Sequence, residues 1–117
     1  MASVKSYRGY RFESNMYRTM EYIMFERQCK KELAAQCRKF GIVIHKFLSN
    51  HFEWSAVLEK GGKFVYVSIS DVRYWNDWYD DVLIRTMAHD CDWRGGSNNS
   101  CSFDKIGEFA ERLFNLQ

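Results

Sequence analysis

Two adjacent glycines, Gly61 and Gly62, lie between two runs in which large apolar residues alternate with polar ones. Glycine readily adopts the positive φ angles of the two-residue turns that join antiparallel strands, so this pair predicts a hairpin turn over residues 60–63. The flanking runs, residues 52–58 and 64–70, are rich in large and β-branched side chains and are expected to be its strands. The middle of the chain is therefore expected to form an antiparallel sheet.

Helical periodicity precedes this sheet region. Apolar residues recur every three or four positions from residue 16 to about residue 40, which predicts one long helix. Ser14 or Asn15 would cap its first turn by accepting a hydrogen bond from a backbone N–H group, and Gly41 is placed to end it.

The rest of the chain supplies further strands and a last helix. Apolar runs at residues 42–44 and 82–87 predict strands, and apolar residues at helical spacing over 103–114 predict a helix with Ser102 as its N-cap. The order helix, antiparallel strands, helix favours an α+β fold. We expect a long N-terminal helix, a sheet of about four strands, and a C-terminal helix packed on the sheet.

The chain has no proline, low-complexity tract or internal repeat, so its 117 residues are expected to form one domain, 1–117. Within it, residues 1–13 mix basic and aromatic types and are a candidate arm that docks only when something pairs with it. No apolar run reaches the length of a membrane span, and the start lacks the apolar stretch of a secretory signal. We therefore expect a cytoplasmic protein without membrane contacts, whose four cysteines are thiols.

Charge is distributed unevenly along the chain. Residues 1–47 carry ten Lys and Arg against four Glu, and residues 48–117 carry seven against eleven acidic residues, so the halves bear about +6 and −4. Lysine and arginine neutralise phosphates, and interleaved aromatic side chains stack on bases, so the first half is consistent with a nucleic-acid-binding accessory or regulatory protein. The residues for this alternative function are Arg8, Arg11, Lys30, Lys31, Arg38 and Lys39. It remains the alternative because the net charge is only +2 and no known nucleic-acid-binding motif is present.

The second half favours a protein partner. Residues 71–81 and 89–99 combine carboxylates with tryptophans, in loops on either side of the predicted strand 82–87. Tryptophan anchors many protein interfaces, and carboxylates can take the place of phosphates in a basic groove, so we expect these loops to bind a protein. At least one tryptophan is also expected to complete the small core. The candidate partner-binding residues are Asp71, Trp75, Asp77, Trp78, Asp80, Asp81, Asp90, Asp92 and Trp93.

Residues for catalysis or metal binding form no recognisable pattern. The chain lacks a nucleophile elbow, and its glycine pairs match neither a dinucleotide fingerprint nor a P-loop, so we expect no enzymatic activity and no cofactor. Residues 90–95 resemble the start of a calcium loop, but Arg94 and Cys101 stand where oxygen ligands are needed. Zinc binding by His89, Cys91 and Cys101 is a third alternative that lacks the paired C-x-x-C spacing, so no metal is expected.

The C-terminal part of the chain resembles small proteins of bacteriophages and mobile elements. The resemblance covers less than half of the chain and rests on Arg85-Thr86, Asp92-Trp93 and residues 95–98, followed by an amphipathic helix. Compact, proline-free domains without catalytic residues are also typical of phage-encoded inhibitors of bacterial defence, including anti-CRISPR proteins. The resemblance implies a non-enzymatic, phage- or plasmid-borne inhibitor in the host cytoplasm. Such a protein binds a CRISPR–Cas or other defence nuclease or surveillance complex and blocks its nucleic-acid binding or cleavage. The long basic and aromatic helix could equally pack on itself in a homodimer.

Overall fold

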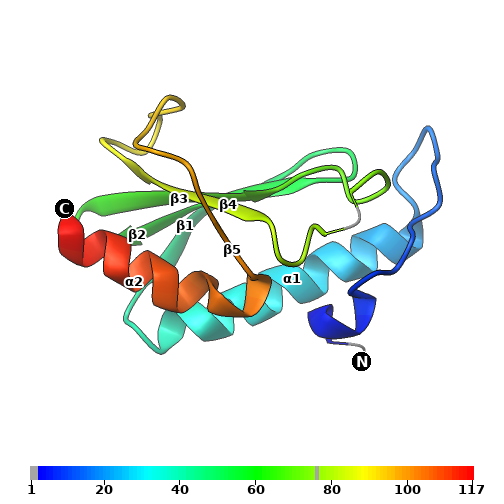
Figure 1. Ribbon diagram of the computed structural model, residues 1–117, viewed down its shortest axis with the longest axis horizontal. Helices are drawn as coiled ribbons and strands as arrows, with labels where there is room; N and C mark the ends of the chain where they lie inside the picture. Colours follow the sequence, from blue (N-terminus) through cyan, green and yellow to red (C-terminus); the bar gives the residue numbers. More distant parts are fainter. Residues whose placement is uncertain (1–2, 76) are drawn as a thin grey trace.

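The computed structural model describes residues 3–75 and 77–117. Over these residues the chain runs through a helix, five strands and a second helix, and a short 3₁₀ helix precedes each α-helix (Figure 1). The elements are η1 (Val4–Tyr7), α1 (Met20–Arg38), β1 (Val43–Ser49), β2 (Trp54–Lys60), β3 (Lys63–Ile69), β4 (Val82–Met87), β5 (Asn99–Cys101), η2 (Phe103–Lys105) and α2 (Ile106–Leu116).

The five described strands form one antiparallel sheet in the order β1-β2-β3-β4-β5, so each strand pairs with its sequence neighbour. The predicted α+β class is therefore confirmed. The prediction of about four strands is one too few, because Asn99–Cys101 pairs with β4, where Cys101 lies opposite Val82. This edge strand has only three residues, which is too short to show an alternating pattern.

The predicted hairpin is also confirmed. Lys60 pairs with Lys63 at the end of the β2–β3 ladder. The two residues between them, Gly61 and Gly62, have φ angles of 59° and 78°, as the favoured two-residue hairpin turn requires.

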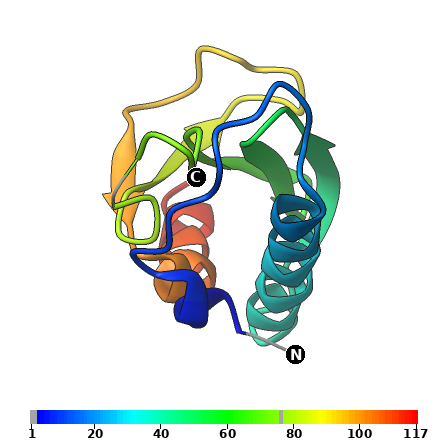
Figure 2. The same cartoon turned by 90° about the vertical axis from the view of Figure 1, so that its right-hand side faces the viewer.

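Both helices lie on the same face of the sheet (Figure 2). Leu58, Val67 and Ile84 are fully buried on that face and share one apolar core with residues of both helices. Because side chains alternate across a strand, the intervening residues point to the opposite, open face. Tyr66 and Arg85 lie opposite each other on this open face, between β3 and β4.

Helix α1 begins later than predicted. Its N-cap is Thr19, whose hydroxyl oxygen accepts a hydrogen bond from the Tyr22 backbone N–H at 3.2 Å. The prediction of a start at residue 16, capped by Ser14 or Asn15, is wrong. The carbonyl oxygens of Asn15 and Met16 instead accept side-chain hydrogen bonds from other parts of the chain, which hold this segment outside the helix.

Of the candidate arm 1–13, residues 1 and 2 lie outside the described residues, and the described part packs against α1 through its apolar side chains. Val4 is fully buried and Phe12 is 4% exposed. The Tyr7 and Phe12 rings stack with their centroids 5.8 Å apart, and both rings contact Phe25 of α1. Tyr7 and Phe12 therefore contribute to the core, whereas Tyr10 is exposed.

The C-terminal helix forms as predicted but is not capped by Ser102. The hydroxyl of Ser102 donates to the Asp104 carboxylate at 2.7 Å, and the η2 turn separates this residue from α2. In the part of the chain that the structure describes, no helix is both long enough and apolar enough to cross a membrane.

Candidate functional site

The two acidic loops lie at opposite ends of β4 (Figure 1). Residues 71–81 lead into this strand and residues 88–98 follow it. A strand of six residues separates the loops by about 20 Å at 3.3 Å per residue. The structure therefore does not bring the nine predicted partner-binding residues onto one surface.

Trp78 belongs to the core and is not available to a partner. Its side chain is 1% exposed, and its ring meets Phe25 edge-on at a centroid distance of 4.8 Å. This is the tryptophan of the two loops that completes the core, as the size of the side chain led us to expect. Trp75 and Tyr74, in contrast, are exposed on the same loop.

Internal cations neutralise part of the charge of loop 71–81. The carboxylate of Asp71 accepts two hydrogen bonds from the Arg73 guanidinium, at 2.6 and 3.0 Å, and these bonds lower the pKa of Asp71. Asp80 pairs with Arg8 of the N-terminal segment. Asp77 and Asp81 are exposed and form no ion pair with any residue that the structure describes.

The carboxylates of loop 88–98 hold the loop itself together. Asp92 accepts hydrogen bonds from the backbone N–H groups of Ala88 at 2.8 Å, Gly95 at 2.9 Å and Arg94 at 3.2 Å. These bonds to the charged form lower the pKa of Asp92 to about 2. The Asp92 carboxylate therefore stabilises the conformation of its own loop, and few of its hydrogen-bond acceptor positions are left for a partner.

Loop 88–98 is also fastened to the open face of the sheet. Asp90 bonds to the His45 ring at 3.1 Å and to the Lys46 ammonium at 3.5 Å, both from β1. At the other side of the loop, Trp93 meets the Tyr66 ring edge-on at a centroid distance of 6.0 Å. Trp93 is 56% exposed, so one side of its ring still faces solvent.

Arg85 forms the centre of this attachment. Its guanidinium lies 4.6 Å from the centre of the Tyr66 ring and donates to the Asp92 carbonyl oxygen at 3.2 Å. A Cβ atom at Gly95 would lie 1.5 Å from Arg85 Nη1, so the loop can approach this closely only with glycine there. The polar residues that make this loop conspicuous in sequence are therefore explained largely by its own folding.

The residues considered for zinc are not gathered into a site. Among the described residues, no group of three or more His, Cys, Asp and Glu side chains is placed to hold a metal ion. Cys101 lies in β5, where burial raises its pKa to about 12, while Cys91 is exposed in the loop. His89 Nδ1 accepts a hydrogen bond from the Cys91 backbone N–H at 3.2 Å, which is a local turn contact.

A groove of about 330 Å³ lies on the sheet at the end nearest loop 71–81. Leu48 and Tyr66 contribute apolar surface to it, and Ser55 and Ser68 contribute hydroxyl groups. Neither serine is hydrogen-bonded to a histidine in the described structure, so the nucleophile–base pair that activates a catalytic serine is not formed there.

The exposed face of α1 is different, because no residue that the structure describes forms an ion pair with its cations. Arg27, Lys31 and Arg38 recur at helical spacing and lie along one outward line of the helix. Lys30 and Lys39 are also exposed, and the Lys30 ammonium lies 5.4 Å from the centre of the Phe47 ring. Within residues 3–75 and 77–117, none of these five side chains forms an ion pair.

Of the three carboxylates of α1, Glu21 is exposed in the first turn, before the first of these cations, and the other two bond to other parts of the protein. Glu26 is buried and pairs with Arg18 at 2.6 Å. Glu32 is half-buried and accepts hydrogen bonds from the Val4 backbone N–H at 2.8 Å and from Gln28 at 2.6 Å. The helix therefore presents cations outward and directs these two carboxylates toward the protein.

Four of the six residues predicted for nucleic-acid binding lie on α1 or directly after it: Lys30, Lys31, Arg38 and Lys39. Arg11 is exposed on the N-terminal segment without an ion pair in the described structure, whereas Arg8 pairs with Asp80. Sequence reasoning missed Arg27, although its spacing of four residues from Lys31 places the two side chains on one face.

No protein-family model matches this chain, and no curated protein or solved structure is detectably similar to it.

Proposed function

We propose that this protein is a non-enzymatic nucleic-acid-binding protein, and that the phosphate backbone of the nucleic acid lies along the exposed face of α1. The observation that carries this proposal is the row of cations Arg27, Lys31 and Arg38, with Lys30 and Lys39 beside it, which forms no ion pair in the described structure. Lysine and arginine arranged in this way neutralise phosphates and release the counterions condensed on them.

Adjacent cations on the exposed face of α1 destabilise the helix when nothing is bound to it. Like charges four residues apart, such as Arg27 and Lys31, repel each other on a helix surface. A solvated helix usually relieves such repulsion with carboxylates among the cations, but Glu32 bonds to the N-terminal segment instead. A bound polyanion would remove the repulsion, which favours a binding surface over a merely solvated one.

The test is fluorescence anisotropy with labelled DNA and RNA between about 50 and 200 mM salt. We expect the affinity to fall steeply as salt rises. A variant with Arg27→Gln, Lys31→Gln and Arg38→Gln should bind at least about tenfold more weakly, and its slope of log affinity against log salt should be shallower by about 2.

A matched control removes the same charge from other surfaces. Lys63→Gln, Lys105→Gln and Arg112→Gln change three exposed cations outside α1. If α1 is the binding surface, this variant retains most of the affinity. Absence of binding at the lowest salt would refute the proposal, and so would an equal loss in both variants.

A second candidate function is inhibition of a bacterial defence nuclease, such as a CRISPR–Cas effector, by a phage- or plasmid-borne protein. Loop 71–81 favours it, because Trp75 is 44% exposed and Asp77 and Asp81 carry charge that no described residue pairs with. Aromatic and acidic side chains together suit a basic protein groove. Since Trp78 is buried and Asp80 pairs with Arg8, this candidate surface is smaller than the sequence suggested.

A pull-down from bacterial lysate, with and without nuclease treatment, separates the two candidates. Recovery of a defence nuclease after nuclease treatment, and its loss with Asp77→Lys and Asp81→Lys, would support inhibition. Retention that depends on nucleic acid and on the α1 cations would support the first proposal. Both candidates are proposed to act in the cytoplasm, which is consistent with four free cysteines.

A further inference from the structure

The exposed face of α1 and the segment before it are divided along their length. Met16, Tyr17, Met20 and Met24 are 78%, 75%, 67% and 53% exposed, which makes the N-terminal part strongly apolar. Met20 and Met24 lie on the same outward line of the helix as Arg27, Lys31 and Arg38. On the helix itself, Met20 and Met24 therefore adjoin the basic residues on one surface, which we call the α1 stripe and extend to the exposed Met16 and Tyr17 that precede the helix in sequence. Its members are Met16, Tyr17, Met20, Met24, Arg27, Lys31 and Arg38.

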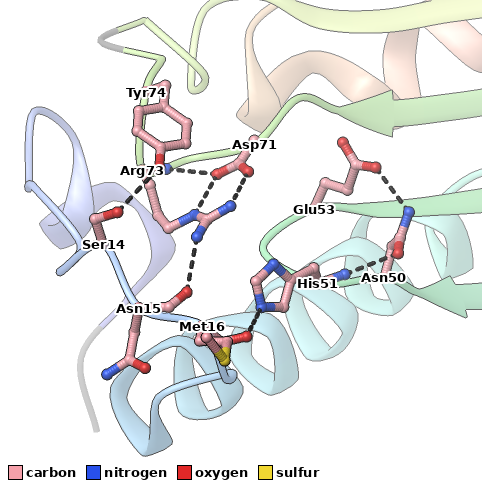
Figure 3. A network of polar contacts seen from close by, with 9 residues as sticks. All are labelled: Ser14, Asn15, Met16, Asn50, His51, Glu53, Asp71, Arg73 and Tyr74. Carbon is pink, nitrogen blue, oxygen red and sulfur yellow. Dashed lines mark hydrogen bonds and ion pairs between the residues drawn. The ribbon is translucent and has the colours of Figure 1, made fainter.

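The segment that carries Met16 and Tyr17 is held in place by hydrogen bonds. Figure 3 shows how the segment before α1 is held against two loops of the sheet. Arg73 Nη1 donates to the Asn15 carbonyl oxygen at 2.9 Å, and His51 Nε2 donates to the Met16 carbonyl oxygen at 2.7 Å. The hydroxyls of Ser14 and Tyr74 are 3.0 Å apart. The backbone of this segment is thus fixed while the Met16 and Tyr17 side chains remain exposed.

A shallow hollow of about 270 Å³ lies where the apolar and basic residues of the α1 stripe meet. Met24, Arg27, Gln28 and Lys31 line it. The Met24 thioether supplies apolar, polarisable surface of the kind that packs well against aromatic rings. Arg27 and Lys31 place two positive charges beside that surface. The hollow therefore suits a flat aromatic ring with an anionic group attached nearby.

We infer that the nucleic acid bound by α1 is single-stranded, an inference that rests on the proposed function. A single strand presents unstacked bases and phosphates side by side, whereas a duplex hides the base faces and presents chiefly phosphate and sugar. One base lies against Met24 in the hollow with its phosphate near Arg27 and Lys31. A neighbouring base stacks on Tyr17, and the strand continues along the basic residues of the α1 stripe toward Arg38.

An anionic membrane surface fits the α1 stripe less well. A helix that lies in a membrane interface carries apolar residues along its whole length, with cations on the flanks. In α1 the opposite side of the helix is buried in the protein core, and the large exposed apolar side chains of the helix stop at Met24. Such a helix could insert only its first turns, and Arg38 at its other end would lie outside that contact.

The experiment compares a labelled mixed-sequence single strand of about 20 nucleotides, as DNA and as RNA, with the corresponding DNA duplex at the same salt. We expect the single strands to bind at least about tenfold more tightly than the duplex. The variant Tyr17→Ser with Met24→Ser should lose about tenfold or more in single-strand affinity, because stacking surface is removed. Its salt slope should stay unchanged, because no cation is removed.

Leu116→Ser is the matched control, since Leu116 is an 81% exposed apolar residue at the end of α2. This variant should bind single strands as the parent protein does. A second measurement needs no variant: titration of the protein with the single strand should shift the methyl NMR signals of Met20 and Met24. The signal of Met87, which is 2% exposed, should stay in place.

The outcomes separate this inference from the proposed function. If neither single strand nor duplex binds, the proposed function fails. If both bind equally and the Tyr17 and Met24 changes have no effect, nucleic-acid binding stands and the single-strand inference is overturned. Sedimentation with phosphatidylserine vesicles, in the absence of binding to either the single strand or the duplex, would overturn both in favour of a membrane surface.

Discussion

Arg18 and Glu26 form an ion pair at the start of α1, with 2.6 Å between Arg18 Nη2 and Glu26 Oε2. Glu26 is 6% exposed and also accepts hydrogen bonds from the Tyr22 hydroxyl at 3.2 Å and the Ser49 hydroxyl at 2.8 Å. Because Ser49 lies in β1, this one carboxylate connects the helix with the edge of the sheet.

Replacement of Arg18 by methionine should destabilise the protein by about 3 kcal/mol, since it leaves a buried carboxylate without its cation. Urea denaturation measures the change. The control is Lys105→Met, which breaks the exposed pair with Glu108 at 3.7 Å and should cost less than about 0.5 kcal/mol. Equal losses in the two variants would show that Glu26 does not depend on Arg18.

Acid should loosen loop 88–98 at a pH set by Asp92. Its pKa of about 2 is lower than the value of about 3.9 for an unfolded aspartate. The charged carboxylate therefore stabilises the folded loop above about pH 4, and this contribution is lost as the pH falls toward 2. The Gly95 amide signal and Trp93 fluorescence should both change in that window.

The variant Asp92→Asn provides the comparison for this titration. Asp90 is in the same loop and its pKa is also lowered, chiefly by the hydrogen bond with His45. Only the part of the pH-dependent change in the Gly95 and Trp93 signals that disappears in Asp92→Asn is assigned to Asp92. A Gly95 amide signal that stays constant from pH 5 to pH 2 would contradict the prediction.

Gly95→Ala should be more damaging than Gly61→Ala. Both glycines have positive φ angles, 52° and 59°, so an alanine at either position is strained by about 1 kcal/mol. At Gly61 an added Cβ meets nothing within 4 Å, whereas at Gly95 it would lie 1.5 Å from Arg85 Nη1 and displace the guanidinium. Thermal denaturation of the two variants should rank them accordingly, and equal melting temperatures would contradict the close contact.

Cys91 should be the one cysteine that reacts quickly with a thiol reagent in the folded protein. It is exposed, whereas burial raises the pKa of Cys37 to about 11 and that of Cys101 to about 12. Burial likewise raises the pKa of Cys29 well above its usual value. A spectrophotometric thiol assay should count one fast equivalent, absent in Cys91→Ser, and four in denaturant. If more than one thiol per molecule reacts quickly in the folded protein, the prediction is refuted.

The hairpin and the two helices were predictable because their signals are local. Gly61 and Gly62 determine a turn by their own backbone preferences, and the apolar spacing of each helix records the face that it buries. The start of α1 was not predictable in this way. Arg73 and His51 hold the carbonyl oxygens of Asn15 and Met16, and these donors are 58 and 35 residues away in the chain.

The candidate site was harder to predict from sequence than the fold, because its charges pair with residues far away in the chain. Counting carboxylates in loops 71–81 and 88–98 suggests an acidic surface, but the partners of Asp80 and Asp90 are 72 and 45 residues away. Only the folded chain shows which charges remain without a partner. The cations of α1 were visible in sequence, and the α1 stripe could have been found from the four-residue spacing of Met20 and Met24.

Because every described strand pairs with its sequence neighbour, the sheet should tolerate insertions in the loops that connect its strands. Each loop of the sheet closes a short segment, and doubling the length of a flexible loop adds only about 0.6 kcal/mol of closure entropy. Insertions beside an exposed residue of the β3–β4 connection, such as Trp75, would leave the order and register of the strands intact, whereas Val72 and Trp78 of the same connection must keep their places in the core.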